Sequence, residues 1–110
     1  MQIPLQISLQ GLRHSSARDD AIRKKVDKLG RYYDRIMRCR VALELSARHK
    51  RHGKQLTVRV DIKVPGGEIA VSRRHDEDLR IALRDAFDAA RRKLEDHART
   101  RRGDVKRRAG

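Results

Sequence analysis

The sequence is poor in cysteine, in aromatic residues and in long apolar runs. Its 110 residues include one Cys, no Trp, two Tyr and one Phe. A single Cys excludes an internal disulfide framework and favours reducing surroundings. No apolar run reaches the roughly 18 residues of a membrane-spanning helix, and no signal peptide is recognisable at the start. We therefore expect one domain of a cytoplasmic protein.

Motifs for catalysis and for metal binding are also missing. We find no phosphate-binding glycine loop, no paired-Cys metal spacing, no helical HExxH and no Ser or Cys with a recognisable base. His49 and His52 make a poor zinc site because no Cys or carboxylate supports them. Carboxylates near the C-terminus lie beside arginines, so ion pairing explains them better than acid–base catalysis does. We predict a protein that is not an enzyme, with no cofactor, metal or small-molecule substrate.

Positive charge is what the sequence has in excess. The 29 Lys and Arg residues against 15 Asp and Glu residues give a formal net charge of +14. Such an excess attracts phosphate backbones or anionic lipid surfaces. Membrane adsorption is the weaker interpretation, because no basic helix has a free apolar face with Trp or Phe to insert. Aromatic platforms for stacking bases are scarce, so Lys and Arg should contact the phosphates of a folded RNA or a duplex.

Four segments alternate apolar and polar residues, as strands with one buried face do. They are residues 2–10, 37–46, 56–64 and a short stretch over 69–71. Pro4 favours an edge position or a strand start. Cys39 falls on the apolar side of the second strand, which predicts a buried thiol rather than a reactive one. Residues 48–54 are expected to form an exposed basic hairpin loop, and residues 65–67 form the next turn.

Two segments have helical spacing of apolar residues. The first should begin at a cap formed by Ser16 with Asp19 and end near Gly30. Its narrow apolar face consists of Ile22, Val26, Leu29 and Tyr33. The second should run from a cap at Asp76 to about residue 102. Its wide apolar stripe consists of Leu79, Ala82, Leu83, Ala86, Phe87, Ala90 and Leu94.

Together these elements predict an α+β domain with two layers and the order β-α-β-β-β-α. Because every strand is apolar on one face alone, both helices must cover the same face of a four-stranded sheet. The last three strands should form an antiparallel meander, whereas the first strand fits beside a later one in either direction. The domain should cover residues 1–98. Residues 99–110 lose the apolar periodicity and should form a fraying helix end followed by a basic, disordered tail.

Basic side chains on both helices are the candidate contacts for a polyanion. Arg80, Arg84 and Arg91 fall at i, i+4 and i+11, in a row along one flank of the second helix. The basic positions of the first helix include Lys24, Lys25, Lys28 and Arg31. A simpler interpretation stays open, in which Asp88 pairs with Arg91 and Arg92, and Glu95 with Arg99, on a solvated face.

Two short motifs resemble a known family. Residues 28–36 read KLGRYYDRI and residues 64–69 read VPGGEI. Both resemble segments of the bacterial ribosome hibernation-promoting factor and ribosome-associated translation inhibitor family, where they end the first helix and join the last two strands. Residues 86–96, AFDAARRKLED, are similar to the second helix of that family.

The resemblance implies a fold similar to double-stranded-RNA-binding domains and a specific partner. Family members bind the rRNA of the small ribosomal subunit, over the sites of mRNA and tRNA, and thereby keep idle ribosomes inactive. The expected partners are therefore the small subunit and the whole ribosome. Two alternatives remain: a general RNA- or DNA-binding protein without a ribosomal role, and a regulatory adaptor for an acidic protein partner.

The resemblance also implies basic contact residues. Lys25, Lys28, Arg35 and Arg92 fall on basic positions of the family pattern, whereas Arg84 stands where members often have Asp. The full set of predicted nucleic-acid-binding residues is Lys24, Lys25, Lys28, Arg31, Arg35, Arg80, Arg84, Arg91 and Arg92.

Overall fold

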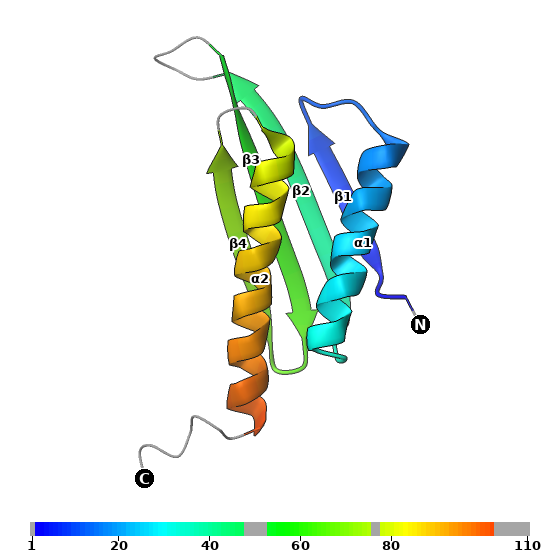
Figure 1. Cartoon of the computed structure of the whole chain (residues 1–110), viewed down its shortest axis with the longest axis vertical. Coiled ribbons are helices and arrows are strands. Elements are labelled where there is room, and N and C mark those ends of the chain that lie inside the picture. Colours follow the sequence, from blue (N-terminus) through cyan, green and yellow to red (C-terminus); the bar gives the residue numbers. More distant parts are fainter. Residues whose placement is uncertain (1, 48–52, 76–77, 103–110) are drawn as a thin grey trace.

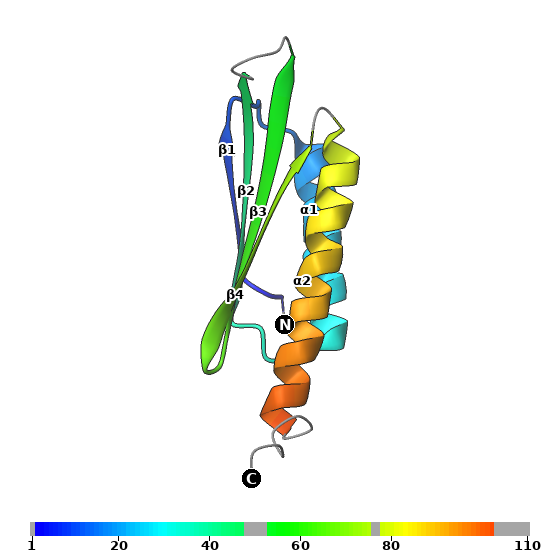
Figure 2. The same ribbon diagram turned by 90° about the vertical axis from the view of Figure 1, so that its left-hand side faces the viewer.

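Two helices cover one face of a four-stranded sheet. A computed structural model describes residues 2–47, 53–75 and 78–102. The elements are β1 (Leu5–Gln10), α1 (Ser16–Tyr32), β2 (Arg38–Ala47), β3 (Lys54–Val64), β4 (Gly67–His75) and α2 (Leu79–Arg102). Figure 1 shows the two helices side by side over the strands, and Figure 2 shows both on the same side of the sheet. The predicted two-layer α+β fold is confirmed.

The strands lie in the order β1-β2-β3-β4. β2, β3 and β4 pair antiparallel, as predicted, and β1 pairs parallel to β2. The parallel pairing follows from α1, which carries the chain back along the covered face before β2 begins. The register aligns the apolar side chains: Val41 lies opposite Ile7 and Val60, and Val60 opposite Val71. One continuous apolar surface therefore faces the helices.

The core lies between this apolar surface and the helices. Its largest fully buried side chains include Ile22, Leu43, Ile62 and Leu94. Cys39 is buried among them, and the expectation of an inward-facing thiol is confirmed. Burial, together with the nearby charge of Asp61, raises the pKa of Cys39 to about 12, so the thiol stays protonated at neutral pH.

The ends of α1 differ from the prediction. Ser15, not Ser16, is the N-cap: its backbone is extended, and its side chain accepts a hydrogen bond of 3.2 Å from the backbone N–H of Arg18. The helix also continues past Gly30 to Tyr32. Gly30 has no left-handed backbone to end the helix, and Tyr33 closes it in an extended conformation instead.

The start of α2 is capped by Asp78. Its carboxylate accepts hydrogen bonds from the backbone N–H groups of Arg80 at 3.0 Å and Ile81 at 3.3 Å. The predicted cap, Asp76, lies outside the described residues. β4 is longer than the predicted stretch over 69–71, because its pairing with β3 continues to His75.

The C-terminal part of the chain is helical as far as Arg102. This end agrees with the helix end expected at about residue 102. Residues 103–110 and most of the predicted loop at 48–54 lie outside the described residues. The limits of the domain and the nature of the tail stay predictions.

Replacing Gly30→Ala should stabilise the domain by about 0.5–1 kcal/mol, because Ala is the better helix former. The added Cβ would lie 3.1 Å from Cδ1 of Ile3, which is a tight contact. That methyl ends a side chain beside a groove of about 520 Å³, so it has room to move. Urea unfolding followed by circular dichroism measures the change. A loss of stability would mean that the Ile3 side chain cannot move to accommodate the added methyl group.

Candidate nucleic-acid interface

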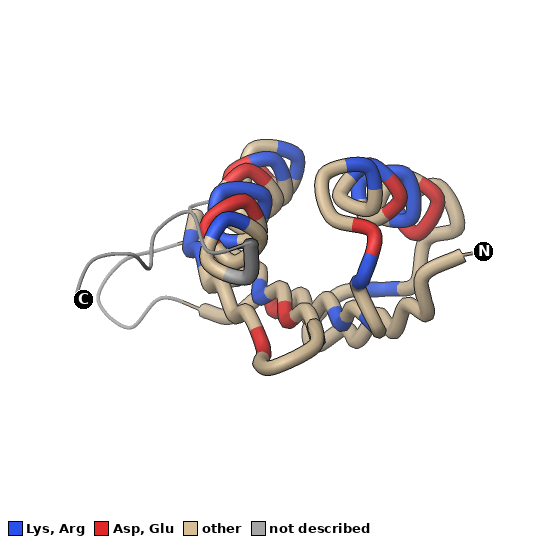
Figure 3. The backbone as a smooth tube through the Cα atoms, turned by 90° about the horizontal axis from the view of Figure 1, so that it is seen from below, with Lys and Arg blue, Asp and Glu red and all other residues tan. Residues whose placement is uncertain are grey.

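A groove between α1 and α2 gathers basic residues from both helices. It has a volume of about 100 Å³ and is called the inter-helix groove below. Its lining residues are Lys25, Lys28, Leu29, Tyr32, Arg84, Phe87, Asp88 and Arg91. Figure 3, which looks along the helices, shows them side by side over the sheet with Lys and Arg on both. Residues distant in sequence thus form one surface.

Helical spacing explains which side chains line this groove. Lys25, Lys28 and Tyr32 stand at i, i+3 and i+7 on α1, so they share one flank of the helix. Arg84 and Arg91 stand at i and i+7 on the facing flank of α2. The buried residues lining the groove, Leu29 and Phe87, belong to the core and tie both walls to the sheet below.

The charge of the groove is predominantly positive. Lys25, Lys28, Arg84 and Arg91 line it together with a single carboxylate, that of Asp88. Neighbouring cations of this kind repel one another and favour an anionic ligand between them.

The ion pairs along α2 differ from those that the spacing suggested. Arg91 Nη1 lies 3.2 Å from Oε2 of Glu95, one turn further on. Arg99 pairs with Asp96 rather than with Glu95. Within the described parts of the chain, no ion pair of Asp88 is present. The proposed pairing of Asp88 with Arg91 and Arg92 was therefore wrong, and the charge of Arg91 is offset by Glu95 instead.

Tyr32 is a groove residue to which the sequence assigned no role. It is 43% exposed, and the guanidinium carbon of Arg91 lies 5.4 Å from the centre of its ring. This is the distance of a cation–π contact. Arg91 is thus held by Glu95 on α2 and by the ring on α1. The signal that could have found Tyr32 is its position seven residues after Lys25, on the same flank of the helix.

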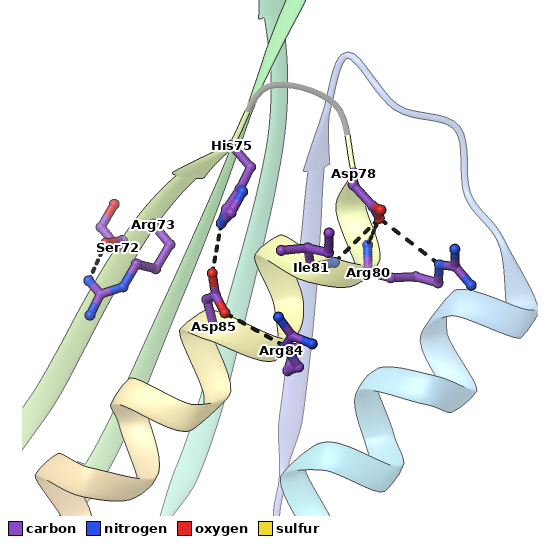
Figure 4. A network of polar contacts seen from close by, with 8 residues as sticks. All are labelled: Ser72, Arg73, His75, Asp78, Arg80, Ile81, Arg84 and Asp85. Atoms are coloured by element: carbon purple, nitrogen blue, oxygen red, sulfur yellow. Dashed lines mark hydrogen bonds and ion pairs between the residues drawn. The ribbon is translucent and has the colours of Figure 1, made fainter.

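The N-terminal end of α2 carries a second polar cluster, drawn in Figure 4. Nε2 of His75 lies 2.9 Å from Oδ2 of Asp85, which joins the end of β4 to the helix. Oδ1 of Asp85 lies 3.7 Å from Nε of Arg84. Nε of Arg80, whose side chain is 94% exposed, lies 4.0 Å from Oδ1 of Asp78. The Arg84 side chain therefore lies beside the carboxylate of Asp85, which His75 at the end of β4 helps to position.

The structure brings together only some of the predicted contact residues. Lys25, Lys28, Arg84 and Arg91 meet in the inter-helix groove. Arg80 lies on α2 one turn before Arg84, outside the groove lining. The remaining four are Lys24, Arg31, Arg35 and Arg92, which are exposed elsewhere on the helices or in the turn after α1. Their role in binding stays a prediction.

The uncovered face of the sheet has a different charge pattern. Its basic residues mostly stand beside acidic ones: Arg59 lies 3.1 Å from Asp61, and Arg38 lies 3.8 Å from Glu68. Arg40 lies directly opposite Asp61 in the register. Cations and carboxylates therefore offset one another on this face, as they also do along α2. Among the described residues, Lys25 and Lys28 of the inter-helix groove have no ion-pair partner, which favours the helical face as the surface for a polyanion.

The interior of the described domain is apolar. No polar or charged residue in residues 2–47, 53–75 and 78–100 is fully buried. The described side chains also form no cluster of three or more His, Cys, Asp or Glu residues that would hold a metal ion. In the same part of the chain, neither helix is apolar enough over its length to cross a membrane.

Comparison with known families identifies the class of protein to which this two-layer α+β domain with its basic groove belongs. Residues 5–102 match the family described as sigma 54 modulation protein / S30EA ribosomal protein. The protein belongs to this family of ribosome-associated factors, which is not a known class of enzyme. The family resemblance of the two sequence motifs is thereby confirmed. No curated protein matches the chain significantly.

Two solved structures have the same fold. The N-terminal domain of Protein Y from Thermus thermophilus is 24% identical, with a TM-score of 0.66 over 88% of this chain and 99% of that chain. A ribosomal subunit interface protein from Coxiella burnetii is 21% identical, with a TM-score of 0.59 over 92% of this chain and 99% of that chain. The four strands and two helices therefore form an arrangement known from other proteins.

Proposed function

We propose that the protein binds the rRNA of the small ribosomal subunit in the channel for mRNA and tRNA, and so keeps idle ribosomes inactive. Membership of a ribosome-associated family supports the choice of partner. The similar structure from Coxiella burnetii is that of a ribosomal subunit interface protein, which agrees with this choice. Such a protein acts in the cytoplasm.

The observation that carries this proposal is the inter-helix groove. Two helices, each anchored to the sheet by its buried face, hold Lys25, Lys28, Arg84 and Arg91 around one narrow space. Cations held at fixed spacing on two rigid elements suit phosphates that are themselves fixed, as in folded rRNA. A free, flexible strand would lose conformational entropy on binding such a surface. The mechanism is steric, because a compact domain held by phosphate contacts excludes mRNA and tRNA.

Sedimentation with ribosomes tests the proposal. We expect the purified protein to migrate with the small subunit and the whole ribosome in a sucrose gradient at moderate salt. High salt should release it, because phosphate contacts weaken as counterions compete. Added tRNA and mRNA should also displace it, because they occupy the same channel.

Other results would favour the alternatives. Binding that is indifferent to tRNA and mRNA would contradict a place in the channel and would indicate a general nucleic-acid-binding protein. A complex that survives RNase treatment would indicate an adaptor for an acidic protein. Protein that stays at the top of the gradient would exclude the ribosome as the partner.

A further inference from the structure

One of the three aromatic residues of this chain is not needed by the core. Phe87 is buried between the helices and the sheet. Tyr33 is half-buried and packs edge-on against His97, with ring centres 5.5 Å apart. Tyr32, by contrast, is exposed beside the inter-helix groove. Among the lining residues of the groove, Tyr32 is the one uncharged side chain that is not buried, so its ring is available to a ligand.

The ring already forms a cation–π contact with Arg91. The guanidinium carbon of Arg91 lies 5.4 Å from the ring centre, and Nη1 of the same guanidinium donates a hydrogen bond of 3.2 Å to Oε2 of Glu95. Both groups are planar, and both stack on nucleic-acid bases in RNA complexes. Because the contact exists before any ligand binds, little side-chain entropy remains to be lost when a base is added.

The charges around the ring indicate what accompanies the base. Lys25 and Lys28 lie within two turns before Tyr32 on α1, and Arg84 lies two turns before Arg91 on α2. Any base that reaches the ring therefore brings its neighbouring phosphates among these cations. A base inside a duplex cannot reach the ring, because both of its faces are already stacked.

We propose that Tyr32 and Arg91 form a stacking platform for one unpaired RNA base, whose neighbouring phosphates are bound by Lys25, Lys28 and Arg84. The proposal rests on the proposed RNA-binding function and adds the class of nucleotide that the groove selects. It predicts that the protein distinguishes RNA with an unpaired base from fully paired RNA. Phosphate contacts alone would not make that distinction.

Two short RNA hairpins test the platform. They share one sequence, with a single bulged 2-aminopurine present in one and absent from the other. We expect tighter binding of the bulged hairpin and quenching of 2-aminopurine fluorescence when the base stacks. Tyr32→Leu should weaken binding of the bulged hairpin at least about fivefold, in line with the usual effect of losing one stacked base. Binding of the paired hairpin should stay unchanged.

Three further variants serve as controls. Tyr32→Phe keeps the ring and should retain the preference for the bulged hairpin. Arg91→Lys keeps the charge but loses the plane, and should reduce the preference without changing the salt dependence. Arg59→Ala removes a cation on the uncovered face of the sheet and should leave the preference intact. Circular dichroism verifies that each variant is folded.

Some outcomes would overturn the platform. One is wild-type protein that binds both hairpins equally or leaves the fluorescence unquenched. Another is a Tyr32→Leu variant that loses the same factor on both hairpins, which would mean that the ring only positions Arg91. Failure of the ribosome-binding function is distinguishable. If the protein ignores ribosomes but still selects the bulged hairpin through Tyr32, the platform stands and the ribosomal role falls.

Discussion

Removing the four cations of the inter-helix groove should weaken binding to the small subunit by more than about 10³-fold. The substitutions are Lys25→Ala, Lys28→Ala, Arg84→Ala and Arg91→Ala. Each lost hydrogen bond to a charged group costs about 1.5 kcal/mol or more, and about 1.4 kcal/mol corresponds to a factor of ten. Loss of four phosphate contacts should also make the negative slope of log affinity against log salt shallower by about three. Titration with purified small subunits at several salt concentrations measures both quantities.

The matched control removes the same charge from the opposite face of the molecule. Its substitutions are Arg40→Ala, Arg59→Ala, Lys63→Ala and Arg74→Ala, on the side of the sheet that the helices leave uncovered. Net charge falls equally in both variants, so any difference in affinity between them is due to where the removed charges lie. We expect the control variant to lose less than about tenfold in affinity for the small subunit, because only long-range attraction is weakened. Equal losses in the two variants would show that binding depends on net charge and that the groove has no special role.

Leu83→Ala should destabilise the domain by about 2–5 kcal/mol, since the shortened side chain leaves a cavity in a close-packed core. Leu83 is only 4% exposed, within the apolar stripe by which α2 packs on the sheet. The chain has no Trp, so urea unfolding is best followed by far-UV circular dichroism. The slope of the unfolding free energy against urea should stay constant, because the unfolded chain exposes nearly the same surface.

Ile81→Ala is the matched control on the same helix. Ile81 is 38% exposed and lies away from the apolar stripe, so its truncation should cost less than about 1 kcal/mol. Circular dichroism before unfolding verifies that both variants keep the fold. A loss below about 0.5 kcal/mol for Leu83→Ala would contradict the register of α2 on the sheet.

The strands and α2 were predictable because burial of one face makes apolar residues recur at a regular spacing in the sequence. Alternation along β2 and β3 assigned one face to the core, and Cys39 followed from that parity alone. The ends of the elements were less predictable, since a cap depends on the backbone of one or two residues. Ser15 and Ser16 offer the same hydroxyl, and only the extended backbone of Ser15 decides between them.

The candidate site was predictable in part. A helical wheel groups Arg84 with Arg91, and the family pattern has basic residues at the positions of Lys25 and Lys28. Neither indicates that these two pairs line one groove, because each describes a single helix. The same limit explains why Tyr32 was overlooked: its value as a platform depends on Arg91, which lies on the other helix.

The sequence by itself determined the order of the elements, the face that each one buries and the large positive charge. These properties are local, since they follow from spacing along one strand or helix. Tertiary structure decided that β1 runs parallel to β2 and that particular flanks of α1 and α2 face each other. Those choices depend on how separate elements pack on one sheet, and packing places side chains together whatever their distance in sequence. The groove, its four cations and its exposed ring are a consequence of that packing.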